Sequence, residues 1–247
     1  MQSPTTNLLI FSALPEMGYL AATHIYHLST QAIEARKHFR VAISGGSLIK
    51  LLAPALTSAP LNTLFDWSAW QLFWVDERCV PLDHVDSNYR LAREQFLDKV
   101  DIPEQQIYTV DTTLPPDAAA RAYEQTLANV FGGEQLPRFD LILLGMGDDG
   151  HTASLFPNHS LMQEQKRWVA PISDSPKPPP ERVTLTLPII NNARRVAFVA
   201  TGENKAAVLS EVLNPATFEE IPAKLIQPTR GEIFWYVDEA AAAQLDD

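Results

Sequence analysis

The chain of 247 residues contains a single cysteine, Cys79. It cannot form an internal disulfide bond, which excludes a disulfide-stapled secreted scaffold and favours a cytoplasmic protein. Basic residues are also scarce: 19 lysines and arginines stand against 30 acidic residues, for a formal net charge of −11. A surface of this charge repels nucleic acid and anionic membranes, so we expect neither as a partner. No apolar run approaches the length of a membrane span.

The composition is that of a globular protein. Hydrophobic residues make up 46% of the chain and charged residues 20%, which is ordinary for a soluble fold. The length allows one large α/β domain or two small ones, with a substantial buried core in either case. An anionic small molecule is still a possible ligand if a few cations converge locally in a pocket.

Apolar runs that are typical of strands alternate with helical patterns along the chain. We predict strands at 8–14, 39–44, 70–76, 139–144, 183–187, 195–201 and 232–237. We predict helices at 48–56, 88–97, 117–131 and 203–213, and an early helix after Pro15 with a buried stripe of Ala21, Ile25, Leu28, Ala32 and Ala35. This alternation predicts an α/β fold with a mainly parallel sheet and helices on both faces.

The segment DLILLGMGDDGHTASLFP, residues 140–157, is the most informative in the chain. A buried strand runs into a glycine-rich turn, and open α/β sheets hold ligands at the carboxyl ends of such strands. Asp149 and His151 are two residues apart, so their side chains point the same way in an extended turn. The alternative is that Asp149 and Thr152 only accept hydrogen bonds from backbone amides around a helix start, and that His151 has no catalytic role.

The same turn contains a GxGxxG pattern formed by Gly145, Gly147 and Gly150. Such a pattern can mark a dinucleotide site. Here Asp148 and Asp149 stand where a pyrophosphate needs bare backbone amides, and the pattern lies far from the first βα unit. We therefore expect no nucleotide cofactor.

A second glycine turn, at residues 44–47, follows the predicted strand 39–44 and precedes a helix. Free amides and the positive end of the helix make Ser44, Gly45, Gly46 and Ser47 a candidate anion cradle, to which the serine hydroxyls add donors. It lacks the GK[ST] ending of a Walker A loop. The alternative is a simple tight turn that Ser47 caps.

Four charged residues stand at other predicted strand or helix ends. Asp76 and Arg78 end the strand at 70–76, Arg182 begins the strand at 183–187, and Lys205 lies in the first turn of a helix. A lysine there opposes the helix dipole unless an anion binds beside it. Each is a surface charge by default, but together with residues 44–47 they predict a site for a phosphorylated ligand.

One helical pattern suggests metal ligands. His24 and His27 lie on one stripe of the early helix, together with Gln31, Glu34 and His38. No third ligand accompanies the two histidines in the sequence pattern, and a solvated helix face explains the stripe. We therefore expect no metal.

The motifs ISGGS, VDER, GMGDDGHTASLFP, RVTLT and TGENK occur in this order and span most of the chain. The chain thereby resembles the 6-phosphogluconolactonases that are related to glucosamine-6-phosphate deaminase. The resemblance implies a single domain over residues 1–247 with a modified Rossmann-like, three-layer α/β/α fold. It also implies a cofactor-free hydrolase of the pentose phosphate pathway that acts on 6-phosphoglucono-δ-lactone. We expect a monomer or small homo-oligomer, between which the sequence does not decide.

The residue types suggest roles for that reaction. His151 would remove a proton from water, and Asp149 would orient and stabilise the imidazole. Arg78 or a backbone amide would stabilise the oxyanion. The substrate phosphate would lie on residues 44–47 with Arg182 and Lys205.

Two alternatives stay open. An amino-sugar phosphate deaminase or isomerase on the same fold would carry a glutamate five residues after the histidine and an aromatic residue at position 78, whereas this chain has Phe156 and Arg78. A non-catalytic sugar-phosphate sensor is the second alternative, although the chain retains Asp149 and His151.

Overall fold

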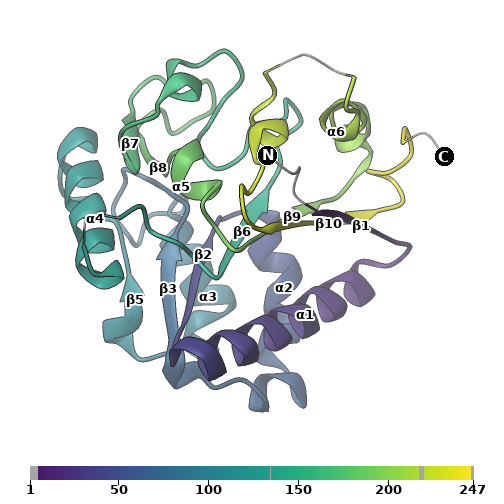
Figure 1. The fold of residues 1–247 in the computed structure, drawn as a ribbon, viewed down its shortest axis with the longest axis horizontal. Helices are drawn as coiled ribbons and strands as arrows, with labels where there is room; N and C mark the ends of the chain where they lie inside the picture. Colours follow the sequence, from purple (N-terminus) through teal and green to yellow (C-terminus); the bar gives the residue numbers. More distant parts are fainter. Residues whose placement is uncertain (1–4, 134, 217–219, 246–247) are drawn as a thin grey trace.

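The computed structural model describes residues 5–133, 135–216 and 220–245, and its centre is a seven-stranded sheet (Figure 1). The strand order is β1-β10-β9-β6-β2-β3-β5, and every neighbouring pair is parallel. The strands are β1 (Thr5–Phe11), β2 (Phe39–Ile43), β3 (Trp70–Trp74), β5 (Ile107–Tyr108), β6 (Leu141–Gly145), β9 (Arg195–Ala200) and β10 (Glu232–Asp238). The prediction of a mainly parallel sheet is confirmed.

Helices cover both faces of this sheet, so the fold has three layers. They are α1 (Leu14–Arg36), α2 (Ser47–Thr57), α3 (Asn88–Gln95), α4 (Pro116–Phe131), α5 (Leu187–Ile190) and α6 (Ala206–Leu213). In Figure 1, α1, α2 and α3 lie below the sheet, and α5 and α6 lie above it. Short 3-10 turns occur at Leu61–Thr63, Trp67–Ala69, Leu97–Lys99, Glu104–Gln106, Ser160–Gln163, Glu203–Lys205 and Pro222–Leu225.

A second sheet of three antiparallel strands is an addition that the sequence patterns did not predict. It has the order β4 (Asp76–Arg78), β8 (Arg182–Leu185) and β7 (Val169–Ile172). The predicted strand at 70–76 is therefore wrong as one element. The chain passes from the large sheet to the small one at Val75. The Val75 amide donates to the carbonyl of Ile43 in β2, and the Val75 carbonyl accepts from the amide of Leu185 in β8.

The buried core explains most of the helix and strand predictions. On α1, Ala21, Ile25, Leu28 and Ala32 are buried as predicted, but Ala35 is exposed because it lies in the last turn, one residue before the helix ends. Residues 141–144 of β6 are fully buried, as expected for a parallel strand covered on both faces. Within the described residues, no helix combines the length and apolar character that crossing a membrane requires.

The strand order decides where a ligand can bind. β2 is connected through α2 to β3 on one side, whereas the chain after β6 returns to the large sheet as β9 on the other side. Connections that diverge in this way leave a crevice between the carboxyl ends of β2 and β6. The 44–47 turn follows β2 and the histidine turn follows β6, so both glycine turns border this crevice.

Candidate active site

A polar cavity of about 260 Å³ opens at the carboxyl ends of β2 and β6. Nine of the ten residues predicted for the site line it, namely Ser44, Gly45, Gly46, Ser47, Asp76, Arg78, His151, Arg182 and Lys205. The tenth, Asp149, does not line this cavity but contacts the His151 ring. The tertiary structure thus brings together segments that lie up to about 160 residues apart in the chain.

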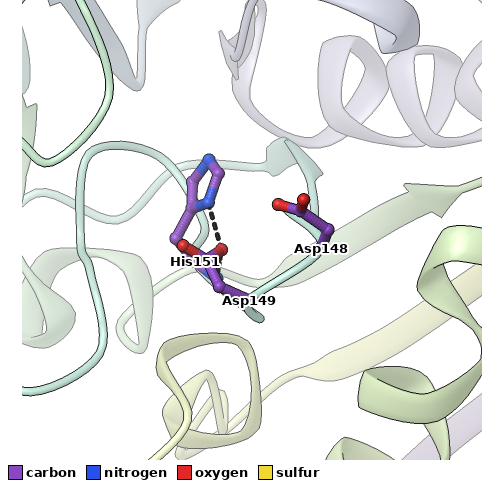
Figure 2. A group of neighbouring side chains, drawn as sticks. All are labelled: Asp148, Asp149 and His151. Carbon is purple, nitrogen blue, oxygen red and sulfur yellow. Dashed lines mark hydrogen bonds and ion pairs between the residues drawn. The ribbon is translucent and has the colours of Figure 1, made fainter.

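His151 and Asp149 form a hydrogen-bonded pair in the turn after β6 (Figure 2). Nδ1 of His151 lies 2.5 Å from Oδ1 of Asp149, and that oxygen also accepts from the His151 backbone amide at 3.1 Å. Figure 2 shows the other ring nitrogen, Nε2, pointing away from Asp149. The ring packs on Phe156, with 4.8 Å between centroids. Fixing Nδ1 as the donor leaves Nε2 as the proton acceptor of a neutral imidazole.

The surroundings keep this pair in the charge state that a general base needs. Burial lowers the pKa of His151 below its ordinary value, although the hydrogen bond and negative charge of Asp149 act in the opposite direction. Burial pushes the pKa of Asp149 upward, but its hydrogen bonds to His151 outweigh this and leave that pKa below its ordinary value. At neutral pH the pair therefore consists of a neutral imidazole and a carboxylate.

Glycine is required at position 147 because the pair leaves no space for a side chain there. A Cβ at Gly147 would overlap the His151 ring and lie 2.6 Å from Oδ1 of Asp149. The Gly147 amide also donates to the His151 carbonyl at 2.8 Å, which closes the turn. The predicted side-by-side placement of Asp149 and His151 is confirmed, and it depends on this glycine.

A Gly147→Ala variant is expected to fold but to lose about 10²-fold in turnover, because displacing a reacting group by about 1 Å costs that much. The wild type is the reference, since Gly145, where a Cβ would meet no atom within 4 Å, itself lines the cavity. Circular dichroism and turnover of Gly147→Ala and the wild type should be compared. Wild-type turnover in Gly147→Ala would show that the pair tolerates displacement.

The turn at 44–47 presents free donors to the cavity. Gly46 is the N-cap residue of α2, with a positive φ of 77°, and no side chain of the described residues caps this helix start. The Ser44 hydroxyl is buried without a hydrogen-bond partner among the described residues. The alternative of a simple turn capped by Ser47 is therefore wrong, and the helix start is left with unpaired amides that suit an anion.

The strand end at 76–78 is fixed by a buried carboxylate. Glu77 accepts from the backbone amides of Arg78, Asn88 and Tyr89 at 2.7–2.8 Å. Burial raises the pKa of Glu77, and these hydrogen bonds act in the opposite direction. Asn88, which the sequence patterns had treated only as part of a helix start, also lines the cavity. A Cβ at Gly45 would overlap its side chain, so the two loops are in close contact.

Arg78 reaches the cavity from the end of β4. Its Nη1 donates to the Asp86 carbonyl at 2.6 Å, and its buried Nε has no partner among the described residues. Asp76 is buried and accepts from the Ser154 hydroxyl at 2.8 Å. Arg78 thus lines the cavity with a guanidinium that has no carboxylate partner among the described residues, whereas the Asp76 carboxylate is already engaged.

Arg182 is only 3% exposed and holds the proline-rich loop in place. Its Nε donates to the Pro179 carbonyl at 2.9 Å, and Nη2 donates to the carbonyls of Lys177 and Pro178 at 2.8 and 3.1 Å. Burial lowers the pKa of Arg182, which Asp76 opposes. Most of its donors are thus directed to the loop, and a contact between Arg182 and a ligand stays a prediction.

Lys177 is a site residue that the sequence patterns missed. It lies in the proline-rich segment SDSPKPPPE, residues 173–181. It lines the cavity and forms an ion pair with Asp148, and its Nζ lies 3.7 Å from Oδ2 of Asp149. Lys205 lines the cavity as well. Burial lowers the pKa of Lys205, and Asp148 opposes this shift.

Among the described residues, one group of side chains could hold a metal ion, namely Asp148, Asp149 and His151. Their ligand atoms lie within 4.8 Å of one another. However, the Lys177 ammonium already pairs with both carboxylates. Nδ1 of His151 is also engaged by Asp149. A metal ion at this group would have to displace the lysine.

His24, a candidate metal ligand, and Cys79, the single cysteine, lie outside the cavity. His24 bonds to the hydroxyl of Tyr236 at 2.5 Å and packs edge-on against Phe234, so it serves the contact between α1 and β10. Burial raises the pKa of the Cys79 thiol to about 11. A thiol with that pKa is a poor nucleophile at neutral pH, as expected for an inert cysteine.

The fold and the cavity define a class: an open α/β/α protein with a histidine–aspartate pair and an uncapped glycine turn at the carboxyl ends of its parallel strands. The family model described as "Glucosamine-6-phosphate isomerases/6-phosphogluconolactonase" matches residues 15–235. The chain belongs to this family.

Named relatives agree with this assignment. A 6-phosphogluconolactonase of Homo sapiens is 46% identical over 249 residues, covering 99% of this chain and 96% of its own length. The structure of the 6-phosphogluconolactonase from Trypanosoma cruzi is 29% identical with a TM-score of 0.89, covering 100% of this chain and 99% of its own. A monomeric glucosamine-6-phosphate deaminase at 17% identity and a TM-score of 0.76, covering 96% and 99%, shares the fold alone.

Proposed function

We propose that this chain hydrolyses 6-phospho-D-glucono-1,5-lactone to 6-phospho-D-gluconate, a step of the pentose phosphate pathway. The observation that carries the proposal is the hydrogen-bonded pair of a neutral His151 and an ionised Asp149, beside a polar cavity whose walls include the 44–47 turn and Lys205. The names of the relatives support the same substrate.

In the proposed mechanism, a water molecule attacks C1 of the lactone while Nε2 of His151 takes one of its protons. Asp149 accepts a hydrogen bond from Nδ1–H, which stays on the ring, and its negative charge stabilises the imidazolium that forms. The C1 carbonyl oxygen becomes an anion, and the Arg78 guanidinium or a backbone amide stabilises it. When the bond from C1 to the ring oxygen breaks, His151 returns its proton to that oxygen, which becomes a hydroxyl group.

The substrate phosphate would lie at the start of α2. The unpaired amides there, the Ser44 hydroxyl and the positive end of the helix favour an anion. Lys205 would add a positive charge. Burial lowers the pKa of Lys205, and a bound anion would raise this pKa again. Arg182 would contribute by holding the loop that carries Lys177, in addition to any direct contact.

This structure lacks a carboxylate that the deaminase alternative requires. The position five residues after the histidine is occupied by Phe156, which is buried and packs on the His151 ring. A carboxylate there would serve proton transfer, whereas a phenyl ring only fixes the imidazole. The sensor alternative would not require Asp149 to hold Nδ1, so the pair favours catalysis.

The proposal is tested by assaying the purified protein for lactone hydrolysis and for glucosamine-6-phosphate deamination, above the spontaneous rates. We expect hydrolysis alone, and we expect it to survive exhaustive treatment with EDTA in nucleotide-free buffer. Loss of activity on chelation and recovery with zinc would contradict the role of His151 as the base. Deamination without hydrolysis would contradict the proposal as a whole.

The pH dependence gives a specific prediction for the pair. Because neutral His151 is the active form and its folded pKa is lowered, kcat/KM should rise with pH along a limb centred below the ordinary value of 6.5. Asp149 raises the pKa of His151, so Asp149→Asn should move this limb to lower pH and reduce kcat.

The substrate phosphate itself titrates near pH 6, which is why the variant is needed as a control. A limb that belongs to the phosphate stays in place when Asp149 is replaced. Identical pH profiles for kcat/KM in the wild type and in Asp149→Asn would therefore remove His151 as the titrating group.

A further inference from the structure

A second polar cavity, of about 430 Å³, lies at the opposite edge of the large sheet. It is formed by the end of α1 and by the residues that precede or begin β6, β9 and β10, so it faces the amino ends of the strands. Five arginines line it: Arg36, Arg138, Arg194, Arg195 and Arg230. We call this cavity the arginine pocket.

The charges in the arginine pocket do not balance. Asp140 pairs with Arg36 at 2.7 Å and lies 3.3 Å from Nε of Arg194, and Glu232 pairs with Arg195 at 2.9 Å. Among the described residues, neither Arg138 nor Arg230 has a carboxylate partner. Five guanidinium groups thus face two lining carboxylates, in a chain whose formal net charge is −11.

Two donors of these arginines are also unused. The Nε atoms of Arg36 and Arg138 are buried, and neither has a hydrogen-bond partner among the described residues. Buried polar groups in native proteins are almost always hydrogen-bonded, and an exception calls for a specific cause such as a bound ion. The pKa of Arg138 is lowered by burial and further by the positive charges of Arg194, Arg230 and Arg36. The guanidinium groups that line the pocket therefore repel one another.

We propose that the arginine pocket is an anion-binding site separate from the active site, and that its ligand is a small molecule with two or more phosphate or carboxylate groups. An anion in the pocket would offset the excess positive charge of the five guanidinium groups that line it. Planar guanidinium groups match the oxygens of phosphate and carboxylate in pairs. A long polyanion such as nucleic acid fits less well, because the acidic remainder of the surface repels it.

The test is calorimetric titration with inorganic pyrophosphate of the wild type and three variants. Arg138→Gln removes a charge that has no carboxylate partner, so no buried carboxylate loses its counterion. Arg121→Gln is the matched control, since Arg121 is an exposed arginine of α4 that pairs only with Asp117 among the described residues. Lys205→Gln reports any binding of pyrophosphate in the active site.

We expect Arg138→Gln to weaken pyrophosphate binding by about tenfold or more, as for loss of one charge-assisted hydrogen bond. Arg121→Gln should bind pyrophosphate within about twofold of the wild type. Lys205→Gln should lose affinity only for pyrophosphate in the active site, and the binding that Arg138→Gln weakens should persist in it. Pyrophosphate should also raise the melting temperature of the wild type more than that of Arg138→Gln.

Three results would overturn the proposal. The first is that the wild type does not bind pyrophosphate. The second is an equal loss of affinity in Arg138→Gln and Arg121→Gln, which would indicate a general effect of charge. The third is a loss confined to Lys205→Gln, which would place the pyrophosphate in the active site alone. None of these results depends on the catalytic activity proposed above.

Discussion

Replacing His151 with alanine is expected to lower kcat for the phosphorylated lactone by about 10²–10⁴, the range for loss of a general base. The ring is the group whose Nε2 faces away from Asp149 and is available for a water proton. KM should change little, because the proposed phosphate contacts come from other segments. The rate must be corrected for spontaneous hydrolysis of the lactone.

The chain offers a matched control for this variant. His159 also forms a histidine–aspartate pair, with Nε2 at 3.0 Å from Asp174, but it does not line the cavity. His159→Ala should therefore keep the wild-type kcat. If kcat of His151→Ala stayed within about threefold of the wild type, the loss of transition-state stabilisation would be under 1 kcal/mol, and His151 could not be the base.

The second large effect is expected from the substrate. Unphosphorylated gluconolactone should react with a kcat/KM lower by about 10²–10⁴, since two charge-assisted hydrogen bonds at about 1.5–3 kcal/mol each are lost. Inorganic phosphate and 6-phosphogluconate should compete with the phosphorylated lactone. Steady-state kinetics on the two lactones measures this directly.

Lys205→Ala assigns part of that difference to one side chain. It should lower kcat/KM for the phosphorylated lactone by about 10–10², the equivalent of one such bond, and leave the unphosphorylated lactone unaffected. Lys99→Ala, at an exposed lysine outside the cavity, is the control. Equal kcat/KM for the two lactones in the wild type would rule out the cradle at residues 44–47.

The histidine turn was predictable because its chemistry is local. The spacing of Asp149 and His151 places both side chains on one side of a tight turn, and the structure confirms their contact at 2.5 Å. The single domain over 1–247 and the state of monomer or small homo-oligomer remain predictions.

The role of Arg182 was less predictable. Its sequence position suggested a free cation at a strand end, but β8 belongs to the small antiparallel sheet and the side chain is buried beneath the proline-rich loop. Lys177 was missed for the same reason, since its partner Asp148 is 29 residues away in the chain. Neither contact leaves a periodic signal in the sequence.

By itself, the sequence determined the two glycine turns and every strand of the large sheet except β5, because hydrophobic periodicity and turn propensity act over a few neighbouring residues. It missed the short elements β4, β5, β7 and α5. Only the tertiary structure decided that β4 and β8 pair outside the parallel sheet, and that five arginines converge at its amino edge. Strand pairing and the burial of charge depend on residues far apart in the chain. Their free energies are set by packing and desolvation in three dimensions, which no local pattern records.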